Sequence, residues 1–217
     1  MSFLKEVGQT IVPGRDTKHG PLPPLLVALT FVTGLVDAFS YLLLGHVFVA
    51  NMTGNVVLLG FALVGAQFAQ HRGHLLTTAA TMQSAFLAAA VVLAVLSGSP
   101  LPDGYRYALI AVLAIAMGIQ NAAARKLAVP DLTTTVLTLT LTGMAADSTI
   151  AGGHGSKAGR RLIAVAAMLA GAVIGAALVL YAHIVYPLII ALMVLATVAA
   201  TTRILGRAGS RWIRAEI

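Results

Sequence analysis

An aspartate lies in the middle of the first long apolar stretch of the chain. Asp37 stands within residues 22–44, which otherwise consist mostly of Leu, Val, Ala, Phe and Thr. An ionised carboxylate at the centre of a membrane costs about 2.5–3.5 kcal/mol on insertion scales, so such residues are commonly functional. A buried acid offers a proton relay, a cation site or a counter-ion for a substrate. The alternative is a structural Asp, protonated or hydrogen-bonded, that locks two helices together.

Amides and hydroxyls follow at the start of the next apolar stretch. Asn51, Thr53 and Asn55 surround Gly54 in the run ANMTGN. Such alternation beside a glycine, which adopts unusual backbone angles, suits a helix start that lines a polar cavity. Helix capping is the simpler interpretation, but a cap needs one such residue rather than three. We therefore expect these side chains to line a polar site.

A second polar group lies further along the chain. Two amides end the stretch 105–123, and a threonine-rich stretch, VPDLTTTVLTLTLTGMAAD, follows. Threonine hydroxyls often bond back to their own helix, and amides often serve only to join helices in membranes. We nevertheless expect some of these groups to share one substrate-binding site with the earlier ones: Asp37, Asn51, Thr53, Asn55, Gln120, Asn121, Thr135 and Thr138.

Other kinds of chemistry find little support. The chain contains no cysteine, which excludes disulfides and thiol catalysis. His71 and His74 are close in sequence but lack a third metal ligand. The chain also lacks a nucleophile elbow, a phosphate-binding glycine loop, a zinc-type His-Glu motif and paired carboxylates. We expect no catalytic residues, no cofactor and no metal, and an intramembrane enzyme is the weakest hypothesis.

Composition indicates which elements position the polar residues. Of 217 residues, 59% are apolar and only 10% are charged, against roughly 25% charged in a soluble domain. The apolar runs are continuous and rich in Ala, Leu and Val, which favours membrane-spanning helices over a barrel. The net charge of +7 arises from Lys and Arg scattered between these runs. That pattern is typical of the loops of membrane proteins and argues against nucleic-acid binding.

The chain divides into seven apolar segments, at 22–44, 48–68, 75–97, 105–123, 132–147, 162–181 and 184–203. Short separators join them, and none is long enough to fold as a domain. We expect an N-terminal cytoplasmic tail at 1–21, a single membrane domain at 22–205, and a basic C-terminal tail at 206–217.

The positions of Lys and Arg favour six full spans. If all seven segments cross, six basic residues lie inside and eight outside, which favours neither orientation. If residues 132–147 instead enter and return on one side, every Lys and Arg except Arg106 lies inside with the N-terminus. We therefore predict an all-α bundle of six spans plus one short broken or re-entrant threonine-rich segment. A seventh full span with an exterior C-terminus stays open as the alternative.

Two stretches share a weak pattern. In residues 34–60 and 118–143, Gly34, Asp37 and Ala38 align with Gly118, Asn121 and Ala122. Paired broken segments in two halves of a chain point to a transporter site near the midplane. Because an odd number of crossings separates the two stretches, the pattern predicts an inverted repeat. A Gly171–Gly175 pair further predicts close helix packing, either within the fold or between the subunits of a homo-oligomer.

Three runs together resemble a known family: GLVDAFSYLLLGHVFVANMTGN, AMGIQNAAARKL and DLTTTVLTLTLT. They are similar to the YoaK-like family of bacterial inner-membrane proteins, a domain of unknown function, from about residue 24 to 205. The resemblance implies a multi-pass protein of the bacterial inner membrane, and implies no reaction. Our leading hypothesis is a transporter or channel for a small solute or ion. A non-transporting scaffold or partner-binding subunit is the alternative.

Overall fold

The fold, described here from a computed structural model, is a bundle of long helices. The structure describes residues 7–8, 10–13, 20–52, 72–98, 100–127 and 158–207. Five of its helices are long and apolar enough to cross a membrane, which confirms the expected helical membrane protein. With the short α3, they are α2 (Leu22–Leu43), α3 (Val49–Met52), α5 (Arg72–Ser97), α6 (Asp103–Leu127), α8 (Ala158–Tyr181) and α9 (Tyr186–Arg207).

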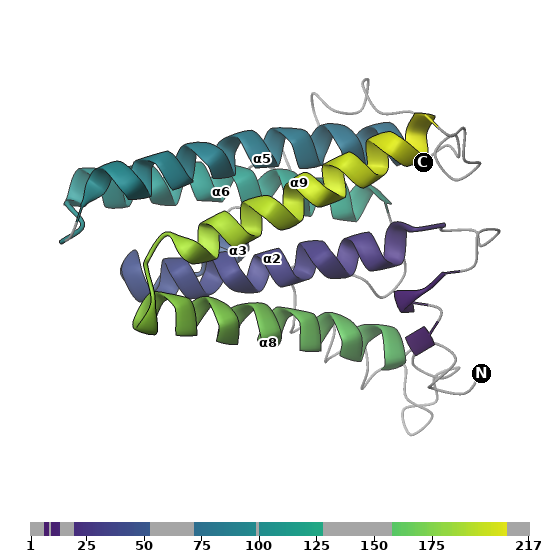
Figure 1. The fold of residues 1–217 in the computed structure, drawn as a ribbon, viewed down its shortest axis with the longest axis horizontal. Coiled ribbons are helices and arrows are strands. Elements are labelled where there is room, and N and C mark those ends of the chain that lie inside the picture. The colour runs from purple at the N-terminus through teal and green to yellow at the C-terminus, as the bar shows by residue number, and fades with distance from the viewer. Residues whose placement is uncertain are drawn as a thin grey trace.

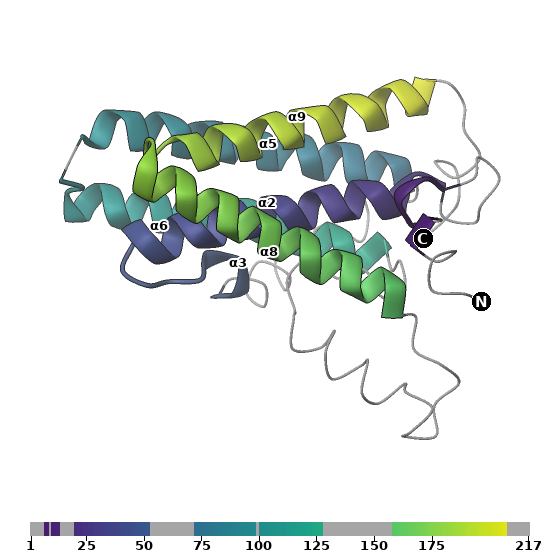
Figure 2. The same cartoon turned by 60° about the horizontal axis from the view of Figure 1, so that its bottom comes forward.

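The long helices lie side by side in alternating directions (Figures 1 and 2). α5 and α6 form one antiparallel hairpin, and α8 and α9 form another. α2 packs parallel to α8, because Gly34 faces Met168 while Gly175 faces Ala38. As a result α2, α5 and α8 begin at one end of the bundle, where α6 and α9 end. We call this the proximal end, and the opposite end, which holds Leu43, the distal end.

Local sequence sets both limits of α2. Pro23 lies at its start, where a missing N–H costs nothing and the fixed φ suits a helix. At its end, Gly45 adopts a left-handed φ of 90°. The Leu44 N–H then donates to the Ser40 carbonyl (2.9 Å), and the His46 N–H donates to the Tyr41 carbonyl (3.1 Å). This glycine-based cap stops the helix and turns the chain toward α3.

Glycines allow α2 and α8 to approach each other closely. A Cβ on Gly34 would overlap the Met168 carbonyl oxygen, and a Cβ on Gly171 would overlap the Phe31 carbonyl oxygen. A Cβ on Gly175 would lie 3.0 Å from that of Ala38. The predicted close-packing pair is therefore used within the fold, because both glycines face α2.

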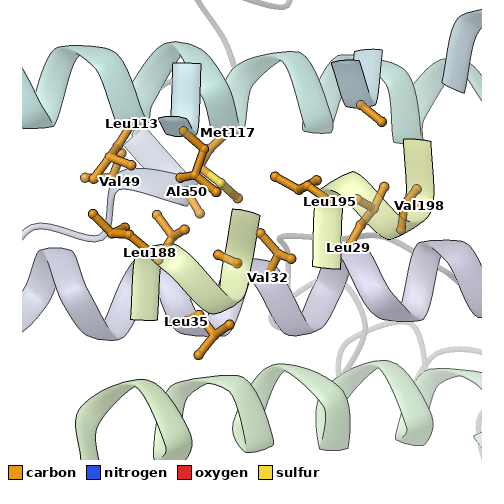
Figure 3. Packing of buried hydrophobic residues seen from close by; sticks show 14 of the residues in the cluster. Leu29, Val32, Leu35, Val49, Ala50, Leu113, Met117, Leu188, Leu195 and Val198 are labelled. Carbon is orange, nitrogen blue, oxygen red and sulfur yellow. The ribbon is translucent and has the colours of Figure 1, made fainter. Parts of the chain in front are cut away.

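An apolar core fills the space between α2, α6 and α9. Figure 3 shows Leu195 and Val198 of α9 next to Leu29 of α2. It also shows Val49 and Ala50 of α3 beside Leu113 and Met117 of α6, so the start of α3 is buried against α6.

Five predicted segments agree with the five long helices to within four residues at each boundary. Of the segment predicted at 48–68, the structure describes only α3. The segment predicted at 132–147 lies outside the described residues. All-helical architecture is thus confirmed, whereas six spans, a re-entrant segment and an inverted repeat stay predictions.

Candidate functional site: a polar centre around Asp37 and Ala50

Asp37 lies in the interior of the bundle, on the face of α2 that meets α3. Its side chain is only 3% exposed. The Ala50 backbone N–H donates a hydrogen bond to Asp37 Oδ1 over 2.9 Å. The second carboxylate oxygen, Oδ2, is buried and has no hydrogen-bond partner among the described residues. A carboxyl group with one oxygen committed and one open can still accept a proton or bind a ligand.

Ala50 is held from two sides at once. Its N–H is bound by Asp37 of α2, and its carbonyl accepts a hydrogen bond from Asn121 Nδ2 of α6 over 3.0 Å. Ser40 adds a weaker contact, since its hydroxyl accepts from the Val49 N–H at 3.5 Å. α2 and α6 therefore fix the start of the segment that follows α2 through its main chain. We call Asp37, Ala50 and Asn121 the clamp.

A second buried network lies next to the clamp, toward the proximal end. The Gln120 amide nitrogen donates to the Leu29 carbonyl (3.0 Å) and to the Thr33 hydroxyl (2.8 Å) of α2. The Gln120 carbonyl oxygen accepts from Gln83 Nε2 of α5 over 2.7 Å. Gln83, Gln120 and Thr33 are each 1% exposed or less. This network joins three helices, and it satisfies the whole amide of Gln120.

Replacing Gln83 with methionine tests the strength of this network. The side chain keeps its length but loses its donor, which leaves the Gln120 oxygen buried without the hydrogen bond from Gln83. We expect a loss of about 1–3 kcal/mol in the free energy of unfolding, measured by denaturant titration in mild detergent. Ser84→Ala is the neighbouring control, because that hydroxyl only bonds back to the Ala80 carbonyl. Equal stability of the two variants would contradict the proposed role of Gln83.

One face of α2 carries the polar residues that face both networks. Thr30, Thr33, Asp37 and Ser40 are all buried, and their spacing of three and four residues places them on one side of the helix. All three hydroxyls bond back to their own helix: Thr30 to the Leu26 carbonyl, Thr33 to the Leu29 carbonyl and Ser40 to the Asp37 carbonyl. A continuous polar stripe therefore runs along α2, with Asp37 within it.

Charged side chains lie at the ends of the bundle. The distal end holds Arg106, which pairs with Asp103 at 3.1 Å. At the proximal end, basic residues stand at the ends of four helices, α5, α6, α8 and α9: Arg72, Arg125, Lys126, Arg160, Arg161, Arg203 and Arg207. Arg203 donates to the Thr81 hydroxyl there (3.0 Å). Among the described helices, no basic side chain therefore pairs with Asp37 in the middle of the bundle.

The structure places only part of the predicted site. Asp37 and Asn121 come together on Ala50, and Gln120 lies beside them in the second network. Asn51 belongs to α3, although its side chain is outside the description. The remaining predicted site residues fall outside the described part of the chain: Thr53, Asn55, Thr135 and Thr138.

Sequence reasoning missed Gln83, Thr33 and Ser40. Gln83 is a polar residue within the apolar segment 75–97, so the argument that singled out Asp37 could have found it. Thr33 and Ser40 share the helical face of Asp37, which was also readable from spacing. Ala50 carries no such signal, because it acts through its backbone.

Comparisons with known proteins place this architecture in a family. The family model described as "Protein of unknown function (DUF1275)" matches residues 25–99 and 64–201. The chain is 33% identical to the UPF0700 transmembrane protein YoaK of Bacillus subtilis (strain 168), over 57% of this chain and 65% of that protein. No solved structure matches. Because the family model covers well over half of the chain, the chain belongs to the DUF1275, or YoaK-like, family of membrane proteins.

Proposed function

We propose that the protein is a membrane transporter or channel for a small solute or ion, with the clamp at the centre of its binding site. The observation that carries this proposal is the open oxygen of Asp37 inside a membrane bundle. An ionisable residue at membrane depth is expensive to keep, and commonly marks a pathway for ions or substrates.

The interruption after α2 supports the same proposal. Gly45 ends α2, and the chain returns into the bundle, where α3 begins at Val49 beside Leu113 (Figure 3). Broken helices at membrane depth are tolerated where protein or a water-filled cavity surrounds them, and transporter sites are commonly built from them. The polar residues that follow α3 in the sequence, Thr53 and Asn55, complete the proposed site together with Asn51.

The two sides of the clamp also suit an inverted repeat. Asp37 and Asn121, which align in the two similar stretches, lie on antiparallel helices and bind the same residue, Ala50. Two repeats related by an axis in the membrane plane would bring equivalent positions together in this way. We propose that the threonine-rich stretch, with Thr135 and Thr138, occupies the position in the second half that ANMTGN occupies in the first.

The directions of the described helices support six crossings. α2 ends at the distal end while α5 begins at the proximal end, so we propose one further crossing between Met52 and Arg72. α6 ends and α8 begins at the proximal end, which suits a re-entrant segment between them. Since basic residues concentrate at the proximal end, we propose that it faces the cytoplasm. A C-terminal fusion to a reporter that is active only in the cytoplasm checks this side.

Transport itself is tested with the purified protein in liposomes. A panel of labelled inorganic ions, amines, amino acids and small carboxylic acids is offered, and uptake is compared with that of protein-free liposomes. We expect at least one of these solutes to enter only the liposomes that contain protein. The proposal is wrong if no member of the panel, in either direction and with or without ion gradients, moves faster than through the lipid alone.

The Gln83–Gln120–Thr33 network favours a second candidate, a scaffold or partner-binding subunit. Its hydrogen bonds join α5, α6 and α2 and leave the Gln120 amide satisfied, as expected of groups that only connect helices. The open oxygen of Asp37 distinguishes the two candidates, because joining helices does not require it. Under the scaffold hypothesis, Asp37→Asn would leave every activity of the protein unchanged.

A further inference from the structure

We infer that Asp37 binds and releases a proton during the transport cycle, so that the ion moved or coupled at this site is the proton. This inference rests on the proposed function and names its ion. The carboxyl group is 3% exposed, and a charge buried in an apolar interior must be paired or neutralised.

No described side chain supplies the pairing charge. α2 itself adds only Tyr41, beyond Asp37 toward the distal end. The titratable and charged groups of the elements packed against α2 lie at the helix ends, whereas α3 has none. At the distal end they are Asp103, Tyr105, Arg106, Tyr107, Tyr181 and Tyr186, and at the proximal end they are Arg125, Lys126, Arg160, Arg161, Arg203 and Arg207. A proton would neutralise the carboxylate where no described cation does.

The open oxygen of Asp37 suits a proton better than a metal cation. Metal cations such as Ca²⁺ and Mg²⁺ require about six oxygen ligands, and the described residues contain no cluster of three His, Asp or Glu side chains. Two described oxygens of the neighbouring residues already take part in hydrogen bonds: the Ala50 carbonyl accepts from Asn121, and the Ser40 hydroxyl donates to the Asp37 carbonyl. A proton needs one oxygen only, and Oδ2 provides it.

The hydroxyls of Thr33 and Ser40 lie on the face of α2 that carries Asp37, one on each side of it along the helix. Protonation forms an O–H bond at Oδ2 and leaves a neutral acid, and release to the other side restores the carboxylate. Hydrogen bonds to an ionised acceptor are roughly twice as strong as neutral ones. Proton uptake therefore weakens the hydrogen bond between the Ala50 N–H and Asp37. Protonation of Asp37 is in this way coupled to the position of α3.

Infrared difference spectroscopy of the reconstituted protein tests this inference directly. The chain has only seven Asp and Glu residues, so the carbonyl stretch of one protonated carboxylic acid can be assigned by substitution. We expect a band that grows as the pH is lowered across roughly pH 10 to 4, is absent from Asp37→Asn, and persists in Asp103→Asn. Asp103 is an exposed, paired aspartate at the distal end, which makes it a matched control.

Two results would overturn the inference. One is the same carboxylic-acid spectrum in the wild type and in Asp37→Asn at every pH. The other is a band of Asp37 that sodium ions remove at constant pH, which would assign the site to a metal cation.

A second readout separates this inference from the proposed function. Liposomes containing the protein and the trapped pH dye pyranine are given an inward proton gradient, with each inorganic ion, amine, amino acid and small carboxylic acid of the panel present in turn. We expect faster acidification with the wild type than with Asp37→Asn. If solute transport depends on Asp37 but the Asp37 carboxyl does not titrate, the proton assignment is wrong while the proposed transport function stands. If the Asp37 carboxyl titrates but the protein moves neither solute nor protons, the proposed transport function is wrong.

Discussion

Replacing Asp37 with asparagine is expected to lower solute transport by about a hundredfold, which corresponds to roughly 2.7 kcal/mol. Asparagine has nearly the same shape, and its amide oxygen can still accept the Ala50 N–H that now binds Oδ1. The clamp should therefore persist, and the protein should purify as a folded monodisperse species. Only the charge and the second oxygen are lost, and these are the features that we assign to binding. Initial uptake rates in liposomes measure the effect.

Asp103→Asn provides the matched control for this variant. It makes the same chemical change at an aspartate whose side chain is 77% exposed and pairs with Arg106 on its own helix. Exposed pairs of this kind contribute about 0–1 kcal/mol to stability, so transport should stay within a factor of two or so of the wild type. A well-folded Asp37→Asn protein with wild-type uptake would exclude the carboxylate from the mechanism.

Replacing Gly34 with alanine is expected to destabilise the bundle strongly. The added methyl group would overlap the Met168 carbonyl oxygen and lie 2.7 Å from the Ala172 nitrogen. Both are backbone atoms of α8, so relief requires the two helices to separate. Overpacking costs about 1–3 kcal/mol and sometimes more, and this contact involves backbone on both sides. The loss in the free energy of unfolding should reach at least the upper part of that range.

Gly104→Ala adds the same methyl group at a position with free space around it. Gly104 lies in the first turn of α6, and a Cβ there meets no atom within 4 Å. The substitution should be neutral or stabilise the protein by up to about 1 kcal/mol, because alanine favours helix. Denaturant unfolding of both variants in the same detergent gives the comparison. If Gly34→Ala were as stable as Gly104→Ala, the close approach of α2 and α8 would be wrong.

Long apolar segments were predictable because the membrane imposes one rule on all of them. Residues without water must form their backbone hydrogen bonds internally, so an apolar run of sufficient length specifies a helix whatever its tertiary partners. This is why 162–181 and 184–203 correspond closely to α8 and α9. Their boundaries shifted by up to four residues, because polar residues such as Arg160 and Arg161 continue a helix beyond the apolar run.

The candidate site was predictable only in part, for a physical reason. Asp37, Gln120 and Asn121 stand out as polar residues in apolar stretches, and the structure brings them near one another. However, the residue that Asp37 and Asn121 share is Ala50, whose backbone makes both contacts. Backbone groups are present at every position, so residue types cannot indicate which backbone N–H and carbonyl will bind the polar side chains. The partner of Gly171 was also undetermined, because a glycine pair fits a helix of the same chain as well as one of a second copy.

Access of water to the centre of the bundle tests the central claim most directly. The chain contains no cysteine, so single cysteines at Ser40 and Thr33, on the stripe of Asp37, are the only thiols present. We predict that a small water-soluble thiol reagent modifies Ser40→Cys and Thr33→Cys in native membranes. Ala191→Cys, in the fully buried apolar core, should stay unmodified. If the two stripe positions proved as unreactive as Ala191, the polar groups around Asp37 would be dry, and the transport account would be contradicted.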